Sequence, residues 1–241
     1  MRLIDIREIK GTITLKSGLH IGAGDTEMRI GGTDNPVIKH PHTQEPYIPG
    51  SSLKGKVRSL LEMESGLMVM TKGDPLQARH LKALPESQKQ KCEKILKIFG
   101  SSGSDSDAIT EYGLGPTRVS FADCLLNDTW RNEARQKRWD FFEVKSENSI
   151  NRIEGTARNP RFTERVVEGA VFDFSVTLKL LGEDEGELYE CLLDGLKLLE
   201  MDALGGSGSR GYGRISFRFE DEELDESFAT RKPFGNGGKQ S

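Results

Sequence analysis

The segment VFDFSVTLKL, residues 171–180, alternates apolar and polar side chains without a break. Alternate residues of an extended chain point to opposite faces, so this pattern predicts a strand with one face in a core and the other in water. The positions predicted to face the core are Phe172, Phe174, Val176, Leu178 and Leu180. A strand of this kind is typical of an antiparallel sheet that is covered by helices on one side.

The other periodic segments suggest how that sheet is built. Alternation predicts strands at residues 5–16, around Val119 and Phe121, and at 214–219, whereas spacings of three and four predict helices at 52–64, 86–98 and 187–204. With the helix at 86–98 set aside, the order is β-α-β-β-α-β. This order predicts an α+β fold of the ferredoxin-like (RRM-like) type, with two helices on one face of an antiparallel sheet.

The chain is predicted to form a single domain over residues 1–228, interrupted by three insertions. They are residues 18–48, 66–116 and 123–168. Insertions of this size exceed ordinary connections and are more often functional than passive. The third insertion contains a polar stretch with scattered apolar anchors, which fits a projecting hairpin. Residues 100–107 are predicted to be a mobile loop, and residues 229–241 a disordered tail.

Composition narrows the class of protein. The three cysteines stand far apart, without metal-ligand spacing, and indicate reduced thiols. No apolar run is long enough to span a membrane, and the first ten residues lack the apolar core of a signal peptide, so we expect a soluble, cytoplasmic protein. The net charge is −4, but residues 181–228 carry 14 acidic and only 4 basic side chains. A polyanion could therefore bind elsewhere on the chain.

Two cation-bearing segments are candidates for binding a polyanion. IPGSSLKGKVRS, residues 48–59, places Ser51 and Ser52 at the start of a helix, where unpaired backbone N–H groups attract phosphate, and it places Lys54 and Arg58 on one helix face. A plain serine cap with solvated cations is the alternative. The hairpin insertion carries further arginines, namely Arg152, Arg158, Arg161 and Arg165.

The segment LGGSGSRGYGRI, residues 204–215, contains five glycines and interleaves Arg210, Tyr212 and Arg214. Glycine lets a backbone approach a ligand closely, and alternating basic and aromatic side chains are typical of proteins that bind single-stranded nucleic acid. The segment lacks the Gly-Lys-Ser/Thr of a Walker motif. A flexible surface loop is the alternative interpretation.

The stretch GGTDNPV, residues 31–37, fits neither a helix nor a central strand. Asp34 lies within it. Asp-Asn-Pro forms turns readily, so this carboxylate could simply stabilise a turn. It could equally be directed at a substrate.

Four of these stretches resemble the RAMP superfamily of CRISPR proteins, and in particular the repeated backbone subunit of type III-A (Csm) interference complexes. They are GGTDNPVIKHP at 31–41, YIPGSSLKGKVRS at 47–59, EVKSENSINRIEGTARNPRFTERV at 143–166 and LGGSGSRGYGRI at 204–215. The first three resemble this subunit specifically, whereas the glycine-rich loop marks the superfamily at large.

The resemblance implies a ferredoxin-like palm that stacks with other copies of itself as a filament along a CRISPR guide RNA, together with other Csm subunits. It implies that a hairpin thumb within residues 123–168 kinks the guide–target duplex, and that Ser51, Ser52, Lys54 and Arg58 contact the guide backbone. Asp34 matches the residue that cleaves target RNA with a divalent metal, Mg²⁺ or Mn²⁺. The 2′-hydroxyl of RNA would be the nucleophile.

Two other functions stay open at this point. One is an RNA-binding scaffold in which Asp34 has no catalytic role. The other is a guide-processing ribonuclease that uses a histidine base without a metal, for which His20, His40 and His42 are candidates. His20 stands between Leu19 and Ile21, which favours a buried histidine at a strand end.

Overall fold

A computed structural model describes residues 1–24 and 35–234 of the 241-residue chain. Its main sheet has four strands in the order β2-β5-β1-β6, and every neighbouring pair is antiparallel. The strands are β1 (Asp5–Leu15), β2 (Val119–Phe121), β5 (Val171–Leu180) and β6 (Ile215–Phe219). The α+β class that the sequence predicts is therefore confirmed.

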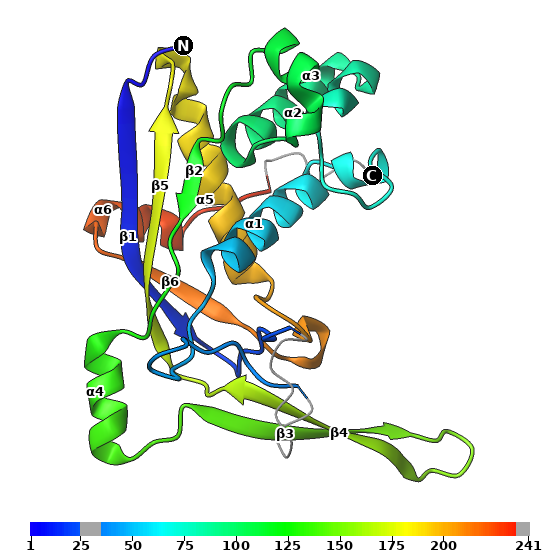
Figure 1. Cartoon of the computed structure of the whole chain (residues 1–241), viewed down its shortest axis with the longest axis vertical. Coiled ribbons are helices and arrows are strands. Elements are labelled where there is room, and N and C mark those ends of the chain that lie inside the picture. The colour runs from blue at the N-terminus through cyan, green and yellow to red at the C-terminus, as the bar shows by residue number, and fades with distance from the viewer. Residues whose placement is uncertain (25–34, 235–241) are drawn as a thin grey trace.

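Helices α1 (Gly50–Glu64) and α5 (Gly186–Met201) lie against one another on one side of the sheet (Figure 1). The alternation in β5 is visible as alternating burial, with all five predicted core residues between 0% and 6% exposed. Leucines of α5 and apolar residues of α1 complete the same core. We refer to the main sheet and these two helices as the palm.

Gly11 lies inside β1, where the strand passes β6 at close range. A Cβ at this position would stand 2.1 Å from the carbonyl oxygen of Arg218. A larger residue would therefore push β1 and β6 apart. Gly11 thus occupies a position that requires the absence of a side chain.

The third insertion forms a helix and a separate two-stranded sheet. Helix α4 (Asp128–Lys137) is capped by Asn127, whose side-chain oxygen accepts hydrogen bonds from the amides of Thr129 and Trp130. Strands β3 (Phe142–Ile150) and β4 (Ala157–Val166) then pair as an antiparallel hairpin with a register irregularity between Glu147 and Ser149. The hairpin extends beyond the palm at its lower end (Figure 1).

The second insertion packs beside α1. It contains the helices α2 (Glu86–Phe99) and α3 (Ser106–Glu111) and the short 3₁₀ helices η2 (Leu67–Val69), η3 (Ala78–Ala83) and η4 (Gly103–Asp105). The prediction of a mobile loop at 100–107 is wrong, because η4 and the start of α3 occupy it. Asp105 is buried there and accepts a hydrogen bond from the Ser101 hydroxyl at 3.1 Å.

The last described residues pack onto the palm. Two short 3₁₀ helices, η5 (Glu183–Glu185) and η6 (Gly208–Arg210), flank α5, and helix α6 (Glu222–Ala229) is the last element in the described residues. Arg231 donates from Nε to Asp194 at 2.8 Å and from Nη2 to the carbonyl of Glu190 at 3.1 Å. The prediction of a disordered tail from residue 229 onward is therefore wrong at Arg231. Residues 235–241 lie outside the described residues.

The cysteines and the lengths of the helices bear on the class of protein. All three cysteines are free, and burial raises the pKa of each thiol to about 12, so the reactive thiolate form is disfavoured at neutral pH. Across residues 1–24 and 35–234, no helix combines the length and the apolar character needed to cross a membrane.

Candidate nucleic-acid interface

The glycine-rich loop meets the base of the hairpin through Tyr212. Its hydroxyl donates to Oε1 of Glu147 on β3 at 3.0 Å, and its side chain is fully buried. Lys145 Nζ lies 4.5 Å from the ring centroid and Arg165 Cζ lies 5.0 Å from it. The expectation that Tyr212 presents an aromatic face to nucleic acid is not supported, because hairpin side chains cover the ring.

The loop backbone holds Tyr212 in this place. Gly213 adopts a φ of +69°, and a Cβ there would stand 1.9 Å from the carbonyl oxygen of Leu204. Its amide donates to the carbonyl of Gly18 at 3.0 Å. The loop is thus fastened to the palm, rather than being the flexible surface loop considered as the alternative.

A polar groove of about 480 Å³ lies between the hairpin and this loop. It is lined by Lys145, Glu147, Asn148, Ser149, Asn159, Arg161 and Arg210. Three cations face one carboxylate, and Arg210 Nη1 lies 3.3 Å from Glu147 Oε2. The structure therefore brings together Arg161 and Arg210, two predicted RNA-binding residues that are far apart in the sequence. Cations, amides and a hydroxyl are the groups that contact a nucleic-acid backbone.

Strand β4 also holds the segment that follows residue 34. Glu164 accepts hydrogen bonds from the amide of Val37 at 2.8 Å and from Lys39 Nζ at 2.9 Å, while its own amide donates to the carbonyl of Asn35 at 3.1 Å. Nδ1 of His20 donates to the carbonyl of Glu164 at 2.7 Å. Asp34 itself lies outside the described residues. Its sequence neighbour Asn35 is fixed to the base of the hairpin.

The start of α1 differs from the expected serine cap. Pro49 occupies the N-cap position, and neither Ser51 nor Ser52 makes a capping side-chain hydrogen bond. Instead, the carboxylate of Asp123 accepts a hydrogen bond from the amide of Gly50 at 2.7 Å. An anion from the protein therefore already occupies part of the positive end of this helix. Ser51 is exposed and Ser52 is half-buried.

Arg58 is not available to a ligand in the way that its sequence position suggests. Its guanidinium donates to Glu62 Oε1 at 2.7 Å, to the carbonyl of Gly100 at 3.1 Å and to the carbonyl of Leu76. These contacts join α1 to the second insertion, so the structure gives Arg58 a structural role. Lys54 is half-buried, and its desolvation together with the charge of Arg58 lowers its pKa.

The remaining predicted cations divide by location. Arg152 near the hairpin tip and Arg214 at the end of the glycine-rich loop are exposed, and neither forms an ion pair with another described residue. Arg158 is exposed and pairs with Glu154, whereas Arg165 is mostly covered and donates to Glu143 at 2.7 Å. Arg152, Arg161, Arg210 and Arg214 thus remain candidates for contacting RNA.

Sequence reasoning missed three residues of this region, namely Lys145, Glu147 and Glu164. They looked like ordinary members of a polar hairpin. Lys145 and Glu147 alternate along β3 with exposed positions, so strand periodicity would have placed them on one face. No local pattern indicates that this face meets residue 212.

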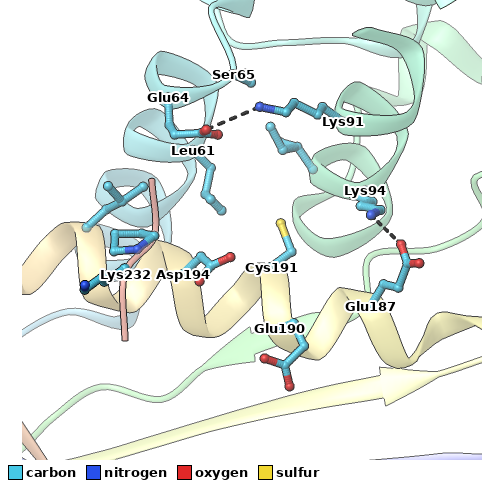
Figure 2. A pocket seen from close by; sticks show the side chains of 13 residues that line it. Leu61, Glu64, Ser65, Lys91, Lys94, Glu187, Glu190, Cys191, Asp194 and Lys232 are labelled. Atoms are coloured by element: carbon cyan, nitrogen blue, oxygen red, sulfur yellow. Dashed lines mark hydrogen bonds and ion pairs between the residues drawn. The ribbon is translucent and has the colours of Figure 1, made fainter. Parts of the chain in front are cut away.

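A second hollow, of about 430 Å³, lies between α1, α2 and α5 (Figure 2). Its lysines Lys91 and Lys94 pair with Glu64 and Glu187, so its charges are largely balanced within the protein. Cys191 faces into it (Figure 2). This hollow does not have the excess of cations found at the hairpin.

The described part of the chain contains no group of three or more His, Cys, Asp or Glu side chains placed to hold a metal ion. Asp34, the predicted metal ligand, lies outside it.

The sequence model of the RAMP superfamily matches residues 12–216. This chain belongs to the RAMP superfamily. A relative from Methanocaldococcus jannaschii, named CRISPR system Cms endoribonuclease Csm3, is 43% identical over 213 residues, which are 87% of this chain and 77% of the relative. A Csm3 of the same name from Methanothermobacter thermautotrophicus is 40% identical over 223 residues, covering 87% of this chain and 82% of the relative.

A solved structure shares the fold. The crystal structure of a Csm3–Csm4 subcomplex of the type III-A CRISPR-Cas interference complex contains a chain that is 31% identical and superposes with a TM-score of 0.53. The match covers 94% of this RAMP chain and 85% of the other.

Proposed function

We propose that this chain is a guide-RNA-binding backbone subunit of a cytoplasmic type III-A CRISPR effector complex, and that it cleaves bound target RNA at regular intervals. In this proposal the four-stranded sheet with α1 and α5 is a ferredoxin-like palm and the β3–β4 hairpin is the thumb. Copies of the chain stack along the guide RNA beside other Csm subunits. The names of its relatives, which are Csm3 endoribonucleases, support this assignment.

The groove between the hairpin and the glycine-rich loop is the observation that carries the proposal. Lys145, Arg161 and Arg210 line it with amide and hydroxyl groups, and they come from three separate segments. Phosphate contacts of this kind position a nucleic-acid backbone without reading its sequence. A guide-binding subunit requires this property, because it must accept many guides.

Asp34 is proposed as the residue that cleaves target RNA. A divalent cation, Mg²⁺ or Mn²⁺, would stabilise charge on the phosphate that is attacked by the RNA 2′-hydroxyl. Because the described residues offer no ready-made set of metal ligands, Asp34 would hold the ion together with RNA oxygens and water. The contacts of Glu164 to Val37 and Lys39 would hold the following segment still.

Replacing Asp34 tests this chemistry. Asp34→Asn keeps the turn-forming ability of the side chain but removes the charge, so target cleavage should fall by about 10²-fold or more. Guide and target affinity should hold, because they rest on cations. Cleavage is measured on a labelled target in single-turnover assays with Mg²⁺, Mn²⁺ or EDTA, and affinity by filter binding.

The two rival functions give different results. A scaffold would bind RNA but leave the target intact in every metal condition. A histidine-dependent ribonuclease would cleave in EDTA and lose activity in His20→Ala. The proposal fails if Asp34→Asn cleaves as the parent does.

A further inference from the structure

The hairpin meets the palm at Tyr212, and this contact differs from an ordinary core contact. The side chain belongs to the glycine-rich loop of the palm, but its polar partner, Glu147, and both flanking cations belong to the hairpin. Beyond the base, the hairpin side chains are mostly exposed, and Ile153 at the tip is 97% exposed. The orientation of the tip therefore depends on contacts nearer the base, where β4 forms backbone hydrogen bonds with Leu19 and Asn35 and β3 meets Tyr212.

Each part of the contact restricts the hairpin in a different way. The 3.0 Å hydrogen bond from the Tyr212 hydroxyl to Glu147 fixes the position of β3 relative to the ring. Lys145 on β3 and Arg165 on β4 lie 4.5 Å and 5.0 Å from the ring centroid, which binds both strands to one aromatic group. Glu147 also pairs with Arg210 of the same loop at 3.3 Å.

We propose that Tyr212 is a positioning residue that sets the angle of the β3–β4 hairpin relative to the palm, and does not itself contact RNA. This inference rests on the proposed function, in which the hairpin determines where target RNA is cut. A full-length hairpin that is free to swing would meet the duplex at variable positions. The hydroxyl of Tyr212 and the carboxylate of Glu147 are then required for uniform spacing of the cuts.

The direct test measures the hairpin angle without using cleavage. Spin labels are attached at Ile153→Cys on the hairpin tip and Lys179→Cys on β5, both exposed positions, in a Cys191→Ser background of the full chain. Cys92 and Cys124 are buried and stay in place. Pulsed electron–electron double resonance then gives the distribution of distances between the two labels.

Tyr212→Phe removes one hydroxyl and keeps the ring, so the fold should survive and the distance distribution should broaden. Glu147→Ala removes the acceptor and also the ion pairs of Glu147 with Arg210 and Lys145, so it should broaden the distribution at least as much. The double variant should broaden it no more than Glu147→Ala does, because that change alone already removes the partner of the Tyr212 hydroxyl. Tyr189→Phe is the matched control: Arg7 lies 5.1 Å from the ring centroid of this half-buried palm tyrosine, and its hydroxyl makes no hydrogen bond with another described residue.

A second readout links the angle to the reaction. With saturating target, Tyr212→Phe should yield cuts of irregular spacing and a reduced cleavage rate, with RNA affinity unchanged. A narrow distance distribution in both Tyr212→Phe and Glu147→Ala would overturn the proposal. A loss of RNA affinity in Tyr212→Phe with the distribution unchanged would also overturn it and indicate direct contact with RNA. Because the distance measurement needs no catalysis, it stays decisive even if Asp34 proves not to be catalytic.

Discussion

Glu62 is an acidic side chain of α1 that is almost completely removed from solvent. It is 6% exposed, and its Oε1 accepts from Arg58 at 2.7 Å and from the amide of Leu76 at 3.2 Å. Arg58 in turn donates to two backbone carbonyls of the second insertion. A buried carboxylate requires such partners, because its charge is poorly solvated inside a protein.

Arg58→Ala should therefore destabilise the protein, by about 3 kcal/mol, because it leaves Glu62 buried without its cation. The free energy of unfolding is measured by urea titration. Lys54→Ala, one turn earlier on the same helix, is the control and should change it by less than about 0.5 kcal/mol. Equal stability of the two variants would show that the Arg58 network contributes nothing. In a double variant of Lys54 and Arg58, a loss of RNA binding could not be distinguished from a loss of structure.

At the level of elements, the hairpin and the segment after residue 34 are coupled through one side chain. Glu164 is 12% exposed and bonds both Val37 and Lys39, while its neighbour in β4, Thr163, forms a bridge with Asn35. Residues 35–39 are thus held against strand β4 of the hairpin. A change at β4 should be felt at the residues next to Asp34.

Glu164→Ala should lower the rate of target cleavage by about 10²-fold, as expected when a reacting group is misplaced by about 1 Å. RNA affinity should stay close to that of the parent, since no predicted phosphate contact is removed. Hydrogen exchange should become faster at the amide of Val37. Glu133→Ala on α4, where the carboxylate pairs with Lys137 on the surface, is the control. A parent-like cleavage rate in Glu164→Ala would show that the anchor has no catalytic consequence.

A buried ion pair joins the segment before β2 to the start of α5. Arg118 is 1% exposed and donates to both carboxylate oxygens of Glu185, at 3.2 and 2.7 Å. Burial alone would raise the pKa of Glu185, but hydrogen bonds from Arg118 and the Leu181 amide, with the charges of Arg118 and Lys97, lower it below its ordinary value. The carboxylate form is thus favoured in the folded state.

This pair should make the protein sensitive to acid. Because the folded-state pKa of Glu185 lies below that of the unfolded chain, its stabilisation is complete above about pH 4.5 and is lost as the pH falls through the folded-state value. Urea midpoints measured from pH 7 to pH 3 should fall in the parent. In Glu185→Gln they should be lower at pH 7 and fall less steeply. Parallel pH profiles would contradict this assignment.

How much of this could be predicted depends on how far apart the interacting residues are in the sequence. The strand at 171–180 and the helix at 187–204 were predicted within a few residues, because their periodicity is local. The contacts of Tyr212 and Arg58 could not be predicted, because their partners, such as Glu147 and Gly100, lie tens of residues away. The serine-cap interpretation of α1 is wrong for the same reason, because the hydrogen bond at the start of the helix goes to Asp123, which lies in another segment.

On the scale of the whole molecule, the two charge signs occupy different elements. Residues 181–228, which form α5, β6 and α6, are strongly acidic, whereas residues 131–165 contain nine basic and six acidic side chains. The hairpin lies at one end of the palm and α6 lies away from it (Figure 1). An overall net charge of −4 therefore does not describe the field at the groove.

This separation predicts that the effect of losing an arginine depends on its location. Arg161→Gln at the groove should weaken RNA binding for every sequence alike and flatten the dependence of log affinity on log salt by about 0.7, the value for one phosphate contact on a single strand. Arg218→Gln is the matched control, because this exposed arginine of β6 lies among Glu220, Glu222 and Asp225. It should leave the slope unchanged. The affinities of both variants are measured by fluorescence anisotropy at salt concentrations from about 50 to about 300 mM, a range over which the release of counterions changes affinity strongly. If the two variants shift the slope equally, RNA does not bind at the hairpin base, and the groove loses its proposed role.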